Sequence, residues 1–342
     1  MIKYLLMLEL SSLLVNAFFY PVIYKFGCEK SRYIMMSCVI LFIGIAWLLV
    51  ALKNGDLDLL TKDTYFTRRS KKLSFIDDMK LIISMGPSSI KEEMFDYFGL
   101  DINTVSAPGF VESRVKIKDI AFKYLLDYMN KAYPCDKTYK GYRLLAVDGS
   151  DICMQSMKDD YENTNPGCGG KPGCMVHLNS LYDILNNRYL DAIIQNLRDK
   201  DEVSAMIEMT ERYEGDKAIF IADRNYISYN LFEHIRNTGN YFLIRVKDID
   251  SKTSLTKRFK SLPSKGTFNK EFKITFTNRS TNDIKSKPEK YETIITNLPS
   301  DKFTSKDIKE LYKLRWDIEV SYRHLKYSVN LNALHSKRRD FI

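Results

Sequence analysis

The chain has 342 residues, 45% of them hydrophobic and 28% charged, which excludes a disordered or collagen-like protein and predicts about two globular domains. The excess of 52 Lys and Arg over 43 Asp and Glu gives a formal net charge of +9, which favours an anionic partner such as nucleic acid or an acidic membrane. Six Cys, none of them in a CxxC pair, argue against a disulfide scaffold or a zinc site.

The first segment, residues 1–55, is hydrophobic and is predicted to form one or two transmembrane helices. Tyr33–Leu52 is 20 residues long and has no charge, which is enough to cross a bilayer as a helix. Leu5–Tyr24 is a weaker candidate because it contains one acidic residue and one proline. The charged loop between them, Lys25–Arg32, stays cytoplasmic by the positive-inside rule. A membrane is therefore a candidate partner through residues 5–52.

The next segment, residues 61–135, is predicted to hold short amphipathic helices. Ser74 begins one of them as an N-cap, with Asp77 three residues later in the position of a near-capping box. Ser89–Phe98 and Val115–Met129 are predicted to be two more.

After about residue 140 the pattern changes to strands and then to strands that alternate with helices, which indicates a mixed α/β sheet. In chain order the predicted elements are strand Arg143–Val147, strands Val176–Leu185 and Arg188–Gln195 joined at Asn186-Asn187, helix Asp201–Arg212, strand Ala218–Ala222, helix Ser228–Arg236 and strand Tyr241–Val246.

A basic insertion follows, at about residues 247–298. Between residues 248 and 290 it has 11 Lys and Arg against five acids. Apolar residues alternate with polar ones at Phe272, Ile274 and Phe276, so part of the insertion is predicted to be strand. The insertion is either a DNA-contacting element or a solvated hairpin without a partner.

Two aspartates follow predicted buried strands. Asp148 comes after Arg143–Val147, and Asp223 comes after Ala218–Ala222. If the strands are neighbours, the carboxylates converge at the carboxyl edge of the sheet, where a divalent cation such as Mg²⁺ or Mn²⁺ would relieve their repulsion. The alternative is that each aspartate is a helix cap or turn residue, and Asp151 is an alternative to Asp148.

The last predicted helix, Phe303–Val329, carries a stripe of functional side chains. Thr304 is its expected N-cap, with an acidic residue, Asp307, at the third helical position. Four residues fall within a stripe of about 60°, and Arg323 borders it. They are Tyr312, Arg315, Glu319 and Lys326. The stripe is either a solvated face with i,i+4 ion pairs or a third carboxylate set among phosphate-binding side chains.

The spacing Tyr312-(2)-Arg315-(3)-Glu319-(6)-Lys326 resembles the Y-(2)-R-(3)-E-(6)-K element of insertion-sequence DDE transposases of the insertion-sequence-four type. Three further blocks resemble the same family, in the expected order: LLAVDGSDI as its first-aspartate strand, HLNSLYDILNNRYLDAIIQ as the hairpin between the aspartates, and IADRNYISYNLFEHI with GNYFLIRVKD as its second-aspartate block. Asn225 stands where the family more often has glycine. The resemblance covers residues 60–342.

The resemblance implies a ribonuclease-H-like catalytic core at residues 140–342, preceded by a helical DNA-end-recognition region at residues 61–135. Asp148, Asp223 and Glu319 would be both the catalytic triad and the ligands of two Mg²⁺ or Mn²⁺ ions.

The resemblance also implies how DNA would be bound. The side chains expected to contact it are Tyr312, Arg315, Lys326, Arg323 and Arg224. His177 and Arg245 are further candidates for the site, and a structural role is the alternative for these two and for Arg224. The partners would be the terminal inverted repeats of the element, target DNA and a second copy of the chain in a homodimeric synaptic complex.

Two features are unusual for this family. The run YPVIYKFGCEKSRYIMMSCVILFIGIAWLL resembles the start of an ABC-transporter permease, so we expect residues 1–55 to be a fusion and the localisation to be cytoplasmic or nucleoid for the core and membrane for the fused segment. The chain stops soon after Lys326, so we expect a truncated or inactive copy. The alternative functions are a metal-dependent nuclease and a membrane-anchored DNA-binding protein without catalysis.

Overall fold

A computed structural model describes residues 57–62, 66, 72–86, 88–99, 104–134, 136–154, 162–165, 173–246, 266–269, 273–279, 290–328 and 331. The predictions for residues 1–55, which include both membrane helices, fall outside these residues. Among the helices that the structure describes, none combines the length and the hydrophobicity needed to span a bilayer. The described residues divide into two compact units, one formed by those up to Met85 with those of Ile90–Met129, and the other by those of Gly86–Ser89 with those from Asn130 onwards.

The first unit is helical, as its sequence predicts. Ser74 caps α3 by accepting a hydrogen bond from the Asp77 amide, and the predicted N-cap is confirmed. Helix α6 begins at Ile120, later than the predicted Val115, because the backbone before it pairs with Thr61 in a short β-bridge. The helices are α2 (Leu57–Leu60), α3 (Phe75–Ser84), α4 (Ile90–Phe98), α5 (Ala107–Arg114) and α6 (Ile120–Ala132).

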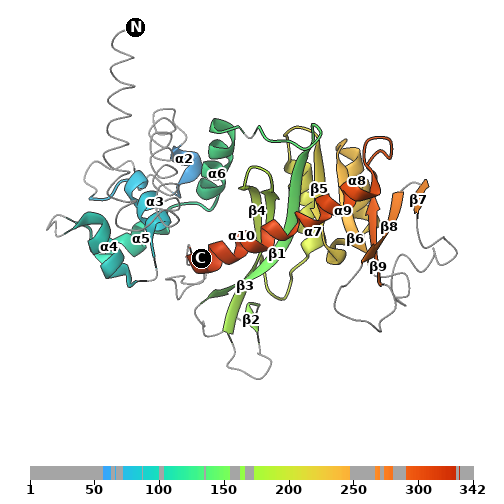
Figure 1. Ribbon diagram of the computed structural model, residues 1–342. Helices are drawn as coiled ribbons and strands as arrows, with labels where there is room; N and C mark the ends of the chain where they lie inside the picture. The colour runs from blue at the N-terminus through green and yellow to red at the C-terminus, as the bar shows by residue number, and fades with distance from the viewer. Residues whose placement is uncertain are drawn as a thin grey trace, which may run out of the picture. The chain divides into compact units, whose positions relative to one another are not determined.

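The second unit is built on a mixed sheet (Figure 1). Its described strands are β1 (Arg143–Met154), β2 (Thr164–Asn165), β3 (Gly173–Asp183), β4 (Arg188–Asn196), β5 (Ala218–Ala222), β6 (Tyr241–Val246), β7 (Gly266–Asn269), β8 (Lys273–Arg279) and β9 (Lys290–Thr296). Strands β4, β3 and β1 are antiparallel neighbours, and β1, β5 and β6 run parallel. The order β4-β3-β1-β5-β6 fits a ribonuclease-H-like core. Strands β9, β8 and β7 continue the sheet beyond β6 within the predicted basic insertion.

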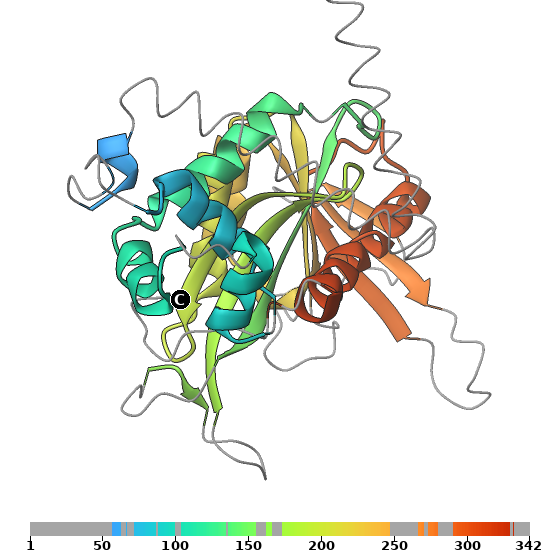
Figure 2. The same cartoon turned by 90° about the vertical axis from the view of Figure 1, so that its left-hand side faces the viewer.

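Helices cover both faces of this sheet (Figure 1 and Figure 2). Alternate side chains of β1 and β5, such as Val147 and Phe220, pack against α7 (Glu202–Arg212) and α8 (Tyr229–Asn237). The intervening side chains, such as Ala146 and Ile221, pack against α9 (Ser305–Lys313) and α10 (Trp316–Arg323) on the opposite face. Burial on both faces explains why the first part of β1, Leu144–Val147, and the whole of β5 are continuous apolar runs in the sequence.

The predicted end of the first strand, at Val147, is wrong. Strand β1 continues to Met154, because β3 pairs with it as far as Cys174. Its pairing with β5 stops at Ala146, opposite Ile221. Asp148 therefore lies inside a strand, although it is just beyond the part of the strand that β5 covers.

The last helix corrects another prediction. The capping box of Thr304 with Asp307 is confirmed, but the predicted helix Phe303–Val329 is not one regular α-helix. The amide of Arg315 bonds to the carbonyl of Tyr312, so a tighter turn separates α9 from α10. A π-helical turn, η4 (His324–Ser328), follows α10.

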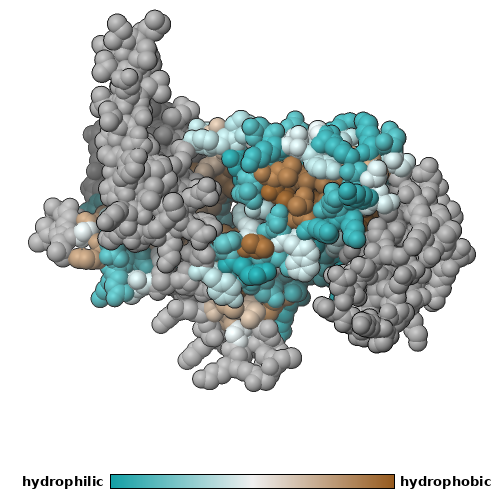
Figure 3. Space-filling view, viewed as in Figure 1, coloured by the Kyte–Doolittle hydropathy of each residue, from teal (hydrophilic) through white to brown (hydrophobic). Residues whose placement is uncertain are grey.

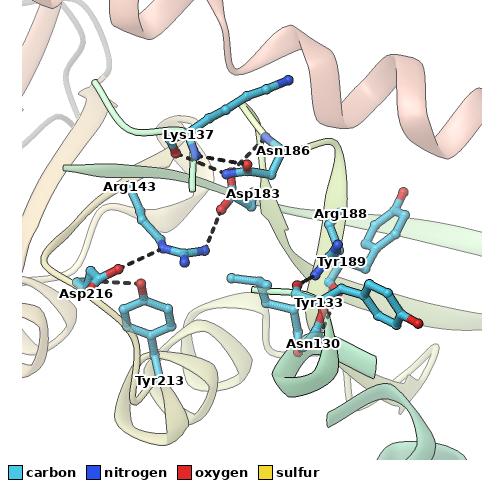
Figure 4. A network of polar contacts seen from close by, with 11 residues as sticks. Asn130, Tyr133, Lys137, Arg143, Asp183, Asn186, Arg188, Tyr189, Tyr213 and Asp216 are labelled. Atoms are coloured by element: carbon cyan, nitrogen blue, oxygen red, sulfur yellow. Dashed lines mark hydrogen bonds and ion pairs between the residues drawn. The ribbon is translucent and has the colours of Figure 1, made fainter. Parts of the chain in front are cut away.

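A polar network closes the edge of the sheet at which β1 and β5 begin (Figure 4). Arg143 Nη1 lies 3.0 Å from the fully buried carboxylate of Asp183, which also accepts from the amide of Asn186 in the β3–β4 turn. That turn confirms the hairpin predicted at Asn186-Asn187. This network lies where β1 and β5 begin, whereas Asp148 lies farther along β1 and Asp223 follows the end of β5. It therefore supports the fold and not the candidate site.

Candidate active site

Asp148 and Asp223 come from adjacent parallel strands. Asp148 lies two residues beyond the last β1–β5 pair, and Asp223 directly follows β5. Asp223 also accepts a 2.7 Å hydrogen bond from the amide of Asn225 and caps the 3-10 turn η2 (Arg224–Tyr226), so the alternative role as a cap applies to it too. Asn225 does not have a positive φ, so this turn does not require glycine.

Glu319 reaches the site from α10, accompanied by Arg315. Arg315 Nη2 lies 2.7 Å from Glu319 Oε1, and its Nη1 lies 3.9 Å from Asp148 Oδ2. The side chain of Arg315 is only 7% exposed, whereas those of Asp148 and Glu319 are 22% and 30% exposed. One buried guanidinium therefore stands between two partly exposed carboxylates from different elements.

The electrostatics indicate that the three carboxylates share one site. The pKa of Asp148 is raised to about 6, chiefly by burial and to a lesser degree by the carboxylates of Asp223 and Glu319, against the lowering effect of Arg315 and the Gly149 amide. The carboxyl group of Asp148 therefore interacts electrostatically with both other acids.

The donor set fits a divalent cation in its chemistry, because three carboxylates supply the hard oxygen ligands that Mg²⁺ and Mn²⁺ prefer. A cation bound beside Asp148 would lower its raised pKa, because a positive charge favours the ionised carboxylate. Within the described part of the chain, however, no three His, Cys, Asp or Glu side chains are arranged so that they could hold a metal ion. Arg315 supplies the neutralising charge in this arrangement.

The five predicted DNA-contacting residues are not equally placed. Tyr312 is buried, with the guanidinium of Arg315 5.8 Å from its ring centroid. Arg224 and Arg323 are exposed, and Lys326 is half-buried in η4. Burial raises the pKa of Tyr312, whereas the charges of Arg315 and Arg245 lower it, which places Arg245 near the same group. Tyr312 and Arg315 therefore belong to the interior of the site, and Arg224 and Arg323 to its surface.

A second polar cluster lies beside Asp148 on the face of α7. His177 is buried on β3, with Nδ1 2.6 Å from Asp151 Oδ1 and Nε2 3.2 Å from Glu202 Oε1. Lys200 lies 3.5 Å from the same Asp151 oxygen. Asp151, the predicted alternative to Asp148, is thus engaged with His177.

Replacing Gly149 with alanine is expected to destabilise the protein by about 1–3 kcal/mol, as overpacking of a filled site usually does. A Cβ at this position would lie 2.4 Å from Nε2 of His177, whose ring is held by two carboxylates and has little room to retreat. Gly173→Ala is the matched control, since a Cβ there meets nothing within 4 Å. Equal unfolding midpoints in urea for the two variants would contradict this packing.

The stability of the protein is expected to fall as the pH rises above about 6.5, because of His177. Burial lowers the pKa of His177, but hydrogen bonds to Glu202 and Asp151 raise it more, so it lies above the ordinary value. Its stabilising contribution is therefore complete below pH 6.5 and is lost as the pH rises through the raised pKa. Melting temperatures of His177→Gln should depend less on pH than those of the wild type. Melting temperatures of His177→Gln that depend on pH as steeply as those of the wild type would contradict this assignment.

Sequence reasoning missed three residues around the triad. The hydroxyl of Tyr322 donates to the carbonyl of Asp148 at 2.6 Å, and the buried Tyr226 and the half-buried Glu202 lie close enough to interact electrostatically with the site. Tyr322 follows Glu319 by three residues, a helical spacing that could have identified it. Glu202 could not have been found, because only the packing of α7 brings it to His177.

The surface over α9 and α10 is mostly hydrophilic with a smaller hydrophobic area (Figure 3). Trp316 and Val320 are exposed on α10, and the Arg315 guanidinium lies 5.1 Å from the Trp316 ring centroid. The candidate site is thus bordered by basic and aromatic side chains, a combination common in nucleic-acid-binding surfaces.

Comparison with known proteins places this arrangement in context. The family model described as Transposase DDE domain matches residues 139–342. The protein InsL of insertion sequence element IS186A from Escherichia coli K12 and the transposase for insertion sequence element IS421 from Escherichia coli are each 36% identical to the chain over 47 residues, 14% of this chain. The matched part of the chain spans only 13% of the length of these relatives.

Among solved structures, a cryo-EM structure of a piggyBac transposase synaptic complex with hairpin DNA is similar with a TM-score of 0.37 and 11% identity, over 80% of this chain and 69% of that one.

Proposed function

The chain belongs to the Transposase DDE domain family, and from this premise we propose that it catalyses phosphoryl transfer on DNA at the ends of an insertion sequence of the insertion-sequence-four type. The observation that supports this most is the Arg315 guanidinium between the carboxylates of Asp148 on β1 and Glu319 on α10, with Asp223 directly after the neighbouring strand β5. The complete Tyr312-Arg315-Glu319-Lys326 spacing supports the finer family assignment.

In this proposal Asp148, Asp223 and Glu319 are the catalytic triad and hold two Mg²⁺ or Mn²⁺ ions. DDE transposase domains are in general dependent on divalent metals, and their acids are the hard ligands such ions need. When bound, the ions supply the charge that activates the attacking oxygen and stabilises the leaving oxygen of an in-line displacement at phosphorus. Water would attack first, releasing a DNA 3′-hydroxyl. That hydroxyl would then attack a target phosphodiester, joining the two strands and releasing a 3′-hydroxyl of the target.

The protein's own side chains would position the DNA. Arg315 is held by its ion pair with Glu319 and by contact with the Tyr312 ring. Once bound cations neutralise the acids, its guanidinium would bind a phosphate near the scissile bond. Arg323 and Lys326 follow Glu319 on α10 and η4, and Arg224 follows Asp223, so all three would bind phosphates farther along the backbone. The basic β insertion at residues 247–298 would add backbone contacts with a steep dependence on salt.

The remaining parts of the proposal concern assembly. The helical region at residues 61–135 would recognise the terminal inverted repeats, and two chains would pair the ends in a homodimeric synaptic complex. Because its substrate is chromosomal DNA, the core would act in the cytoplasm or nucleoid. The hydrophobic residues 5–52 would bind or insert into a membrane.

A metal-dependent nuclease is the second candidate, because a nuclease can use the same carboxylates. Joining of DNA ends distinguishes the two functions. The full-length chain would be incubated with Mg²⁺, a labelled duplex carrying the element's terminal inverted repeats, and supercoiled target plasmid. Label covalently joined to the plasmid supports a transposase. Cleaved duplex without joined product would favour a nuclease. Salt-sensitive binding without cleavage would favour a DNA-binding protein that lacks catalysis.

A further inference from the structure

One hydrogen bond connects the strand of Asp148 to the helix of Glu319. The hydroxyl of Tyr322 donates to the backbone carbonyl of Asp148 at 2.6 Å and lies 3.5 Å from the carbonyl of Leu178 on β3. Tyr322 is buried, and it follows Glu319 by three residues on α10, so both side chains leave neighbouring turns of one short helix.

This bond contacts β1 where the strand is no longer paired with β5. Asp148 lies beyond Ala146, the last residue of β1 that pairs with β5, so on that side β5 no longer fixes the strand. Helix α10 follows a tightened turn and is followed by π-helical residues, so neither of its ends continues in regular α-helix. A contact from the last turn of α10 to the backbone of Asp148 therefore limits how far the carboxylates of Asp148 and Glu319 can move apart.

We propose that Tyr322 is a positioning residue that sets the separation of Asp148 and Glu319. The inference rests on the proposed function, because it concerns the geometry of the same three acids. The phenol contacts the backbone carbonyl of Asp148 and not its carboxylate. Small displacements of catalytic groups are costly to rate, so loss of this single bond would act on the chemical step more than on DNA binding.

Tyr189 provides a matched control, because its hydroxyl also anchors α10. The hydroxyl of Tyr189 on β4 lies 2.7 Å from the hydroxyl of Ser321, the residue before Tyr322. The two tyrosine rings are neighbours, with centroids 6.4 Å apart. Tyr189→Phe and Tyr322→Phe each remove one partly buried hydroxyl that anchors α10, yet only Tyr322 contacts a residue of the triad.

The test compares full-length wild type, Tyr322→Phe and Tyr189→Phe in three measurements. They are the steady-state kinetics of cleavage of an end-containing duplex, the Mn²⁺ concentration that gives half-maximal rate, and hydrogen–deuterium exchange of amides 147–150. For Tyr322→Phe we expect a kcat lower by at least about tenfold with KM within twofold, which corresponds to about 1.4 kcal/mol in the barrier. We also expect a higher Mn²⁺ requirement and faster exchange at amides 147–150. Tyr189→Phe should match the wild type in all three.

Equal kinetics and equal exchange in the two variants would overturn the inference, because any effect would then come from loosening α10 in general. A wild type that neither cleaves DNA nor responds to Mn²⁺ would overturn the proposed function instead. Even then the exchange measurement decides the inference: unchanged protection of amides 147–150 in Tyr322→Phe would show that this hydroxyl does not fix the strand of Asp148.

Discussion

Replacing Asp148 with asparagine is expected to stop DNA cleavage and, at the same time, to stabilise the metal-free protein by about 1–3 kcal/mol at neutral pH. The loss of one metal-binding carboxylate should lower the cleavage rate by about 1,000-fold or more, since each acid supports several kcal/mol of transition-state stabilisation. The gain in stability has a separate cause, which is that a carboxylate buried near two other acids is costly to ionise.

The pH dependence gives the sign of this effect. Because the pKa of Asp148 is raised to about 6 in the folded protein, the folded state holds its proton more tightly than the unfolded state does. Wild-type stability should therefore fall between about pH 4 and pH 6 on account of this group, and the gain of Asp148→Asn should be present above pH 6 and absent below pH 4.

Asp151→Asn is the matched control three residues along the same strand. Burial raises the pKa of Asp151, but the hydrogen bond from His177 and the charge of Lys200 lower it more, so its ionised form is stabilised in the folded state. The same substitution should therefore destabilise the protein at neutral pH and leave cleavage largely intact. Urea denaturation curves that shift in the same direction for both variants would be inconsistent with this account.

The second large effect is expected for Arg315→Met, which keeps an unbranched side chain and removes the charge. Breaking a buried ion pair usually costs 3–5 kcal/mol, and we expect about 2 kcal/mol here because the side chains of Asp148 and Glu319 are partly exposed. The cost should be larger at pH 7.5 than at pH 5, since loss of Arg315 raises the pKa of Asp148 further and protonation then removes the repulsion.

Arg323→Met provides the control for this prediction. Arg323 is exposed on the same helix, so the same change should alter stability by less than about 0.5 kcal/mol. The double variant Arg315→Met with Asp148→Asn should recover much of the lost stability, because the unpaired acid is then neutral. Chemical denaturation at the two pH values measures both expectations, and a pH-independent cost would argue against an electrostatic cause.

The bounds of the core strands could be predicted from the sequence in some cases and not in others. Ala218–Ala222 and Tyr241–Val246 are confirmed residue for residue. Ala218–Ala222 is buried at every position, and a strand buried on both faces leaves a continuous apolar run in the sequence. The end of β1 was predicted wrongly, since Asp148-Gly149-Ser150-Asp151 reads locally as a turn, whereas pairing with β3 keeps it extended.

The candidate site shows the same division between local pattern and tertiary contact. The helical spacing brought Arg315 and Glu319 together in the prediction, and their ion pair is present. The break after α9 was not predictable from composition, because the segment contains neither proline nor glycine. The buried placement of Tyr312 depends on the packing of α9 against the sheet, which a side-chain stripe alone does not specify.

The central claim is that Asp148, Asp223 and Glu319 form one metal-dependent phosphoryl-transfer site. The measurement that tests it most directly is nicking of a duplex carrying the element's terminal inverted repeats by the full-length chain, with Mg²⁺, with Mn²⁺ and with a chelator, beside a folded Glu319→Gln variant. The account predicts nicks at the element's ends that require the metal and are absent with Glu319→Gln. Nicking by Glu319→Gln at the wild-type rate, or nicking that persists in the chelator, would contradict it.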